Sequence, residues 1–151
     1  MAASNFKPST LHLSLPFFGD AHTKMTERLL TWIETQVVDE SDDRAACREW
    51  VKLLGQGDWL RFCVPSKSGG VLERLDSRAL VLIREALAFY SPLADFAFAM
   101  QGLGSGAITL AGRPEQQKDY LVPVGWWFDE EAQLWEPPES RMGPTPERDG
   151  E

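Results

Sequence analysis

The longest uncharged stretch of the chain limits the possible folds most, because few structures accept its composition. Residues 96–112, FAFAMQGLGSGAITLAG, run for 17 residues between Asp95 and Arg113 and contain four glycines. A helix that spans a bilayer needs about 20 predominantly apolar residues, so this stretch lies at the lower limit. Its glycines and polar residues weaken that interpretation further. We therefore expect no membrane span.

The hexapeptide GLGSGA within this stretch matches G-x-G-x-x-G/A, the pattern of a loop that cradles a dinucleotide pyrophosphate. Such a loop needs a strand before its first glycine, a helix after its last, and an acidic residue about 20 positions further on. Arg113-Pro114 limits that helix to about one and a half turns, and nothing upstream supplies neighbouring parallel strands. A small nucleotide-binding module is therefore the weaker interpretation.

A helix explains the same residues better. Phe96, Ala99, Met100, Leu103 and Ala107 recur at i, i+3, i+4, i+7 and i+11, which places them in one continuous apolar stripe. Each glycine costs a helix about 0.5–1 kcal/mol relative to alanine. A helix tolerates that cost where a neighbour packs closely against its backbone or where it kinks. The pattern predicts a buried helix.

The remaining segments are also mostly helical. Apolar periodicity predicts helices over residues 20–38, 42–54 and 77–90 and a short one from Pro114. Ser41 and Asp76 are the expected N-caps of the second and third helices. Alternation over residues 60–64 favours a short extended segment. The predicted fold is all-α: a small bundle of about five helices with one extended loop and a mostly irregular acidic C-terminal tail.

Charge divides the chain unevenly. The formal net charge of −8 comprises −2 over residues 1–124 (13 basic, 15 acidic) and −6 over residues 125–151 (2 basic, 8 acidic). Neither part has a basic patch, which argues against a nucleic-acid partner. The last 27 residues also hold four of the ten prolines and three of the six tryptophans. A Pro- and acid-rich composition is typical of segments without a packed core.

Residues with obvious chemistry are few. Cys47 and Cys63 make neither a disulfide framework nor a metal set, which favours two reduced thiols and a reducing compartment. His12 and His22 have no cysteine or acid at metal-ligand spacing, so we expect solvated or capping roles. The serines lack the strand–turn–helix context of a nucleophile. We therefore assign no catalytic residue and no metal ligand.

Four segments in order resemble the N-terminal helical domain of the acyl-CoA dehydrogenase family. They are LPFFGDAH, LLGQGDWLRFCVPSKSGG, LIREALAFYSPLADFAFAMQGLGSGAITLAG and EQQKDYLVPV. The most specific feature is LGxGAITLAGxxEQQKxYL after an RExLA helix. The resemblance divides the chain into an N-terminal extension (1–14), the helical domain (15–124) and a divergent acidic Trp/Pro-rich tail (125–151).

This resemblance implies a flavoenzyme that uses FAD to oxidise the Cα–Cβ bond of an acyl-CoA thioester in fatty acid metabolism. In the family, the acyl tail lies in a slot between helices, and the fourth helix of the first domain forms one wall. By position, Phe96, Ala99, Met100 and Leu103 match that wall. The implied substrate is acyl-CoA, and the implied location is the cytoplasm or, alternatively, the mitochondrial matrix.

The chain departs from the family at three places. Ser68 stands where an aromatic residue usually precedes Gly-Gly. After YLVPV, the chain lacks both the flavin-contacting stretch and the later helical domain that holds the catalytic glutamate. We therefore assign no flavin contact and expect this chain to be inactive alone. We interpret residues 125–151 as a foreign end from a frameshift, mis-splicing or a truncated gene, and expect self-association through an exposed apolar face.

An alternative function belongs to another class. The helical domain would be a non-catalytic scaffold, and the acidic tail, residues 125–151, would dock a partner protein. Loss of a partner on deletion of the tail would distinguish this function from that of a flavoenzyme domain.

Overall fold

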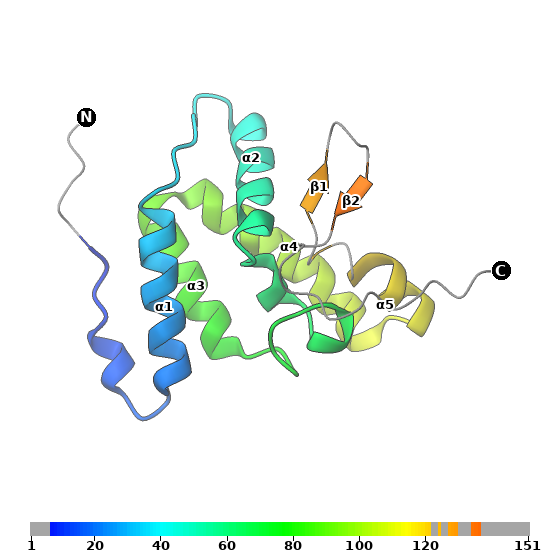
Figure 1. The fold of residues 1–151 in the computed structure, drawn as a ribbon, viewed down its shortest axis with the longest axis horizontal. Helices are drawn as coiled ribbons and strands as arrows, with labels where there is room; N and C mark the ends of the chain where they lie inside the picture. The colour runs from blue at the N-terminus through cyan, green and yellow to red at the C-terminus, as the bar shows by residue number, and fades with distance from the viewer. Residues whose placement is uncertain (1–6, 122–123, 125–126, 130–133, 137–151) are drawn as a thin grey trace.

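The computed structural model describes residues 7–121, 124, 127–129 and 134–136. Its helices are α1 (Asp20–Ile33), α2 (Asp43–Gln56), α3 (Ser77–Tyr90), α4 (Pro92–Ala111) and α5 (Pro114–Leu121), with 3-10 turns η1 (Leu11–Ser14), η2 (Leu60–Cys63) and η3 (Ser66–Ser68) (Figure 1). The predicted all-α fold with about five helices is confirmed.

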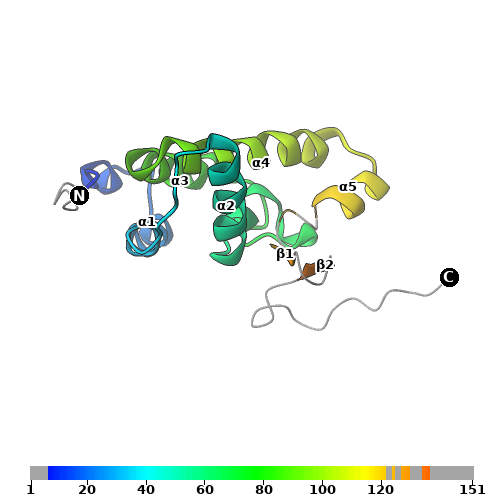
Figure 2. The same cartoon turned by 90° about the horizontal axis from the view of Figure 1, so that it is seen from above.

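The helices form two layers. Seen from above, α3 and α4 lie end to end in one layer, α1 and α2 lie beneath them, and α5 sits at the far end of α4 (Figure 2). α1 packs on α3, and α2 packs on α4. One side of the α3–α4 layer therefore faces the core and the other side faces outward.

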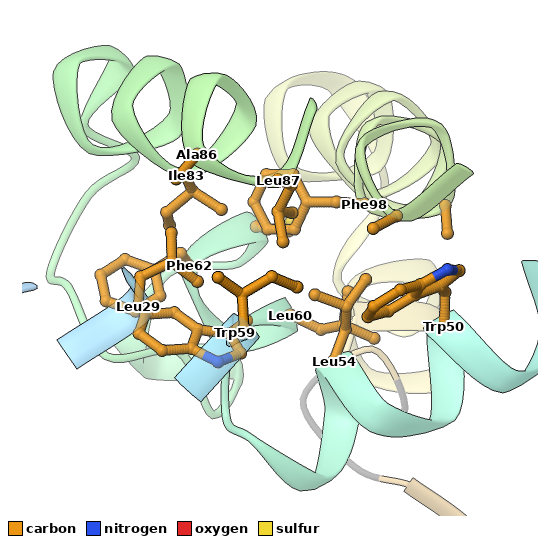
Figure 3. Close-up of a cluster of buried hydrophobic side chains, with 14 of the residues drawn as sticks. Leu29, Trp50, Leu54, Trp59, Leu60, Phe62, Ile83, Ala86, Leu87 and Phe98 are labelled. Atoms are coloured by element: carbon orange, nitrogen blue, oxygen red, sulfur yellow. The ribbon is translucent and has the colours of Figure 1, made fainter. Parts of the chain in front are cut away.

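A single hydrophobic core fills the space between the layers (Figure 3). Its largest members come from helices α1 to α4 and from the turn around η2: Leu29, Trp50, Leu54, Trp59, Leu60, Phe62, Ile83, Leu87 and Phe98. Each such side chain contributes about 1.5–3 kcal/mol when it is fully removed from water. Only one face of α4 packs against this core.

A short hairpin follows the helices. β1 (Trp127–Asp129) and β2 (Leu134–Glu136) pair antiparallel, with Phe128 opposite Trp135, and β1 lies beside α2 (Figure 1). The composition predicted a mostly irregular tail, so this pairing is an unpredicted element. The rest of that tail lies outside the described residues.

Three local predictions are wrong. α1 ends at Ile33 and not at residue 38, because the hydroxyl of Thr35 donates to the Trp32 carbonyl at 2.7 Å and turns the chain away. Asp42, and not Ser41, caps α2 by accepting the amides of residues 44 and 45 at 2.9 and 3.1 Å. Residues 60–63 form the 3-10 turn η2 and not an extended segment.

Two boundaries follow the sequence. Asp76 caps α3 as predicted, with its Oδ1 accepting the Arg78 amide at 2.9 Å. α3 ends at Tyr90, just before Pro92 begins α4. Ser91 between them caps α4, because its Oγ accepts the Ala94 amide at 3.0 Å. Only Ser91 therefore separates α3 from α4.

The loop after η2 depends on its two glycines. Gly69 has a φ of +89°, in the left-handed region that favours glycine. A Cβ on Gly70 would lie 1.8 Å from the Val64 carbonyl oxygen, so no larger residue fits there. Arg61 Nε also donates to the Gly69 carbonyl at 2.8 Å. The loop is therefore held rigidly against η2.

Candidate functional site

The stripe predicted from the sequence lies on the outward face of α4. Phe96, Met100 and Leu103 are 53%, 43% and 68% exposed, and Ala99 between them is half-buried. All four come from one helix and run along one side of it. The structure brings them together as an uncharged apolar surface, which we call the α4 stripe.

The opposite face of α4 makes the core contacts. Ala94, Ala97, Phe98 and Ser105 are buried there. The helix itself is confirmed. The sequence predicted a buried helix without fixing which face contacts the core, because residues 96–112 are almost entirely apolar and both faces carry helical periodicity.

The GLGSGA hexapeptide lies inside α4. Amides in a helix interior donate to carbonyls four residues earlier, so they are not free to cradle a pyrophosphate. No strand leads into Gly102 within the described residues, because α4 begins ten positions earlier, at Pro92. The dinucleotide-loop interpretation is therefore wrong.

The glycines of α4 differ in their surroundings. A Cβ on Gly102 would meet Cys63 Sγ at 3.6 Å, an ordinary contact, whereas Gly104 and Gly106 have open space around them. No contact among the described residues explains the last two. Because glycine has no side chain, the backbone of α4 is bare at these two positions beside the α4 stripe.

Ser105 and Cys63 anchor the middle of α4 to η2. Ser105 Oγ lies 2.7 Å from the Gln101 carbonyl oxygen and 3.2 Å from that of Cys63. Burial raises the pKa of the Cys63 thiol to about 12. The thiol is therefore protonated at neutral pH and is part of the packing, because nucleophilic reactivity requires the thiolate. Cys47 is a second free thiol and is half-buried.

One ion pair borders the α4 stripe. Arg84 donates from Nε and Nη2 to the two carboxylate oxygens of Asp95 at 2.7 and 2.8 Å. This two-point pair joins α3 to the first turn of α4, beside Phe96. Its geometry commits the carboxylate of Asp95 to a guanidinium, so Asp95 is poorly suited to remove a proton from a substrate.

Ser68, which stands where the resemblance implies an aromatic residue, is 5% exposed and offers no stacking surface for a flavin. A shallow depression lies between residues 8–12 and helices α1 and α3.

Other residues named from the sequence have structural roles. His22 caps α1 by accepting the Gly19 amide on Nδ1 at 3.1 Å, which confirms the expected capping role. His12 Nε2 lies 3.3 Å from Glu85 Oε2. Within the described ranges, no three potential metal ligands gather. Helices of the described chain are also too short or too polar to cross a bilayer.

A family model described as "Acyl-CoA dehydrogenase, N-terminal domain" matches residues 19–125. The match begins at the N-cap of α1 and covers all five helices, which is more than half of the 151 residues. No curated protein matches the chain. The helical fold and the family match agree, and the chain belongs to the acyl-CoA dehydrogenase family through its N-terminal domain.

Proposed function

We propose that this domain supplies one wall of the acyl-binding slot of a flavoenzyme that oxidises the Cα–Cβ bond of acyl-CoA thioesters in fatty acid metabolism. The α4 stripe carries the proposal, because Phe96, Ala99, Met100 and Leu103 form an uncharged, outward-facing apolar surface. Apolar surface left open on a soluble domain commonly marks a binding site. The functional unit is residues 15–124.

The stripe would bind the acyl chain by removing it from water. Each buried methylene contributes about 0.8 kcal/mol, so even a short contact favours binding. Phe96 and Met100 carry the bulk of the stripe and would narrow the slot, while Ala99 leaves room between them. Gly104 and Gly106 would let an acyl chain approach the helix backbone. The domain would thus position the substrate and exclude water.

This domain would take no part in the chemical step. When bound, FAD would supply the acceptor for the hydride, and we assign it none of the described residues. Proton removal needs a positioned base, whereas the acid beside the stripe, Asp95, is paired with Arg84. We therefore propose that the 151-residue chain alone does not oxidise acyl-CoA.

Amide chemical shifts on the labelled full chain test the binding role. Octanoyl-CoA should shift the resonances of residues 96–103, and free CoA should not. Phe96→Asp should remove the response. Val37→Asp is the matched control, because Val37 is an apolar residue that is 93% exposed outside any helix. Equal responses to octanoyl-CoA and CoA, or a response that survives Phe96→Asp, would exclude the α4 stripe as the acyl site.

The same surface leads us to propose self-association of the isolated chain. Exposed apolar patches favour association between copies. Sedimentation velocity should show a concentration-dependent rise in mass that Leu103→Asp reduces. We also propose a reducing compartment, the cytoplasm or alternatively the mitochondrial matrix, because both cysteines are free thiols.

A further inference from the structure

The segment before α1, residues 7–18, lies across α1 and α3 as a strap that buries none of its own residues completely. Polar contacts, most of them exposed, attach it to α3 and, through the ion pair of Lys7 with Glu34 at 2.9 Å, to the end of α1. Arg78 Nη1 donates to the Phe17 carbonyl at 3.0 Å, and His12 Nε2 approaches Glu85 at 3.3 Å. Exposed contacts of this kind contribute little each, so the strap is weakly held.

The strap lies over a depression between α1 and α3. On the helix side this depression is lined by Thr26, Leu30, Leu82, Glu85 and Ala86. Release of the strap would uncover this lining, which we call the groove between α1 and α3.

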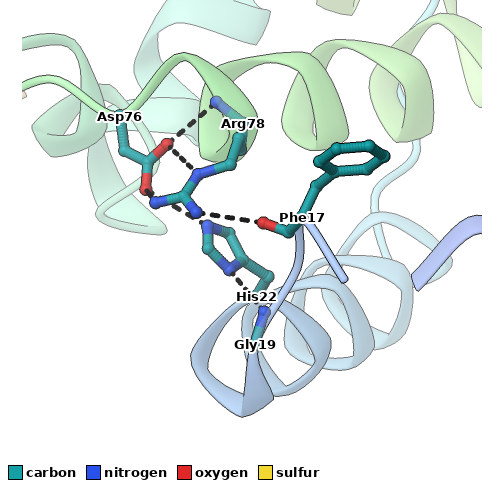
Figure 4. Close-up of polar contacts among 5 residues, drawn as sticks. All are labelled: Phe17, Gly19, His22, Asp76 and Arg78. Carbon is teal, nitrogen blue, oxygen red and sulfur yellow. Dashed lines mark hydrogen bonds and ion pairs between the residues drawn. The ribbon is translucent and has the colours of Figure 1, made fainter. Parts of the chain in front are cut away.

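His22 lies at the junction of the strap with α1 and α3 (Figure 4). Its Nδ1 accepts the Gly19 amide at 3.1 Å, and its Nε2 lies 3.2 Å from Asp76 Oδ2. A nitrogen that accepts an N–H carries no proton, so this geometry requires the neutral ring with its proton on Nε2. The ring of Phe18, the last residue of the strap, packs edge-on against His22 with centroids 5.7 Å apart.

Two charged groups face His22 from α3 and its cap. Asp76 receives three hydrogen bonds from Arg78, including Nη2 to Oδ2 at 2.7 Å. Arg78 holds the pKa of the Asp76 carboxyl well below its usual range, so this carboxylate remains ionised while a histidine titrates. From α1 itself, the nearby acid is Asp20 in the first turn. From the strap comes the Phe18 ring, which also packs edge-on against a second titratable ring, His12, with centroids 5.8 Å apart.

We propose that His22 is a pH-sensitive latch for the strap. Protonation of Nδ1 turns an acceptor into a donor that faces the Gly19 N–H, which breaks the cap of α1. The new cation also lies at the N-terminus of a helix, where positive charge is unfavourable. Asp76 attracts it weakly, because Arg78 already neutralises that carboxylate. In mild acid the hydrogen bond that caps α1 therefore breaks. Phe18 then loses its contact with His22, and the groove between α1 and α3 opens.

Hydrogen exchange of the Gly19 amide in the full 151-residue chain tests the latch. Between about pH 7.5 and pH 5, the protection of Gly19 corrected for intrinsic exchange should fall about tenfold, the loss of one hydrogen bond. His22→Gln keeps an acceptor and a donor but does not titrate, so its protection should be independent of pH. His12→Gln removes the other imidazole, and the pH response of Gly19 should survive in it.

Three results would overturn the latch: protection that does not change with pH in the unmodified chain, an equal fall in His22→Gln, or loss of the response in His12→Gln. A measurement without any variant keeps the test independent of folding. Nitrogen-15 shifts of the His22 ring at neutral pH should show the neutral form with its proton on Nε2. A charged ring, or a proton on Nδ1, would contradict the proposal.

Discussion

The indole N–H of Trp50 donates to Glu40 Oε1 at 3.0 Å, and the same oxygen accepts the hydroxyl of Ser91. A residue in the linker between α1 and α2 thereby ties α2 to the start of α4. Trp50 is 4% exposed and Ser91 is also 4% exposed. Removal of Glu40 therefore leaves two buried donors without their acceptor.

Glu40→Ala should lower the free energy of unfolding by about 2–4 kcal/mol, because each buried polar group left unpaired costs about 1–3 kcal/mol. Glu40→Gln retains an acceptor oxygen at the same reach and should cost less than half as much. Urea denaturation followed by tryptophan fluorescence measures both values. Equal losses in the two variants would show that the carboxylate, and not the acceptor, stabilises the junction.

Two glycine-to-alanine substitutions should change the stability of the domain in opposite directions. Gly70→Ala places a Cβ 1.8 Å from a carbonyl oxygen and should destabilise the domain by about 2 kcal/mol or more, since the backbone must shift. Gly104→Ala fills open space within a helix and should stabilise it by about 0.5–1 kcal/mol. Thermal unfolding of the two variants and of the parent chain measures both changes in stability. A destabilising Gly104→Ala would indicate a contact at that position.

Asp76 should stabilise the fold except in acid. Arg78 lowers the pKa of this carboxyl in the folded chain, so its contribution is fully present above the unfolded value of about 3.9 and disappears as the pH falls through the folded value. The stability difference between the parent chain and Asp76→Asn should shrink as the pH falls below about 4. Denaturation at each pH measures it, and a difference that grows in acid would contradict the assignment.

The two thiols should react unequally. Burial raises the pKa of Cys63 to about 12, so at pH 8 almost none of it is thiolate, whereas Cys47 is half-buried. Iodoacetamide followed by peptide mass spectrometry should label Cys47 first and Cys63 only when the domain unfolds, because the thiolate is the reactive form. Faster labelling of Cys63 in the folded chain would show that η2 opens.

The number of helices was predictable from the sequence because it depends on local signals. Asp76 and Pro92 mark the ends of α3, and the apolar periodicity of residues 96–112 predicts α4. The end of α1 was not predictable, because the apolar pattern continues to Val37 while the Thr35 hydroxyl ends the helix by bonding to a carbonyl. Alternating apolar residues at 60–64 indicated a strand, although a 3-10 turn buries them equally well.

The face of α4 that contacts the core was not predictable from the sequence for a different reason. Phe96 and Phe98 are both apolar and lie two positions apart, yet only Phe98 is buried. Periodicity identifies a stripe but does not say what the stripe faces when the whole helix is apolar. The His22–Asp76 contact was also hidden, because it joins residues 54 positions apart. Only the packing of α1 on α3 brings them together.

Photocrosslinking tests whether the α4 stripe binds an acyl chain. An octanoyl-CoA analogue with a diazirine on the acyl chain, irradiated with the full chain, should attach within residues 96–103 of α4, and excess unlabelled octanoyl-CoA should compete. Phe96→Asp should reduce the labelling at least about tenfold, since burial of a phenylalanine contributes about 1.5–3 kcal/mol. Competable labelling confined to another part of the chain, or labelling of α4 that free CoA competes equally well, would contradict an acyl-binding wall.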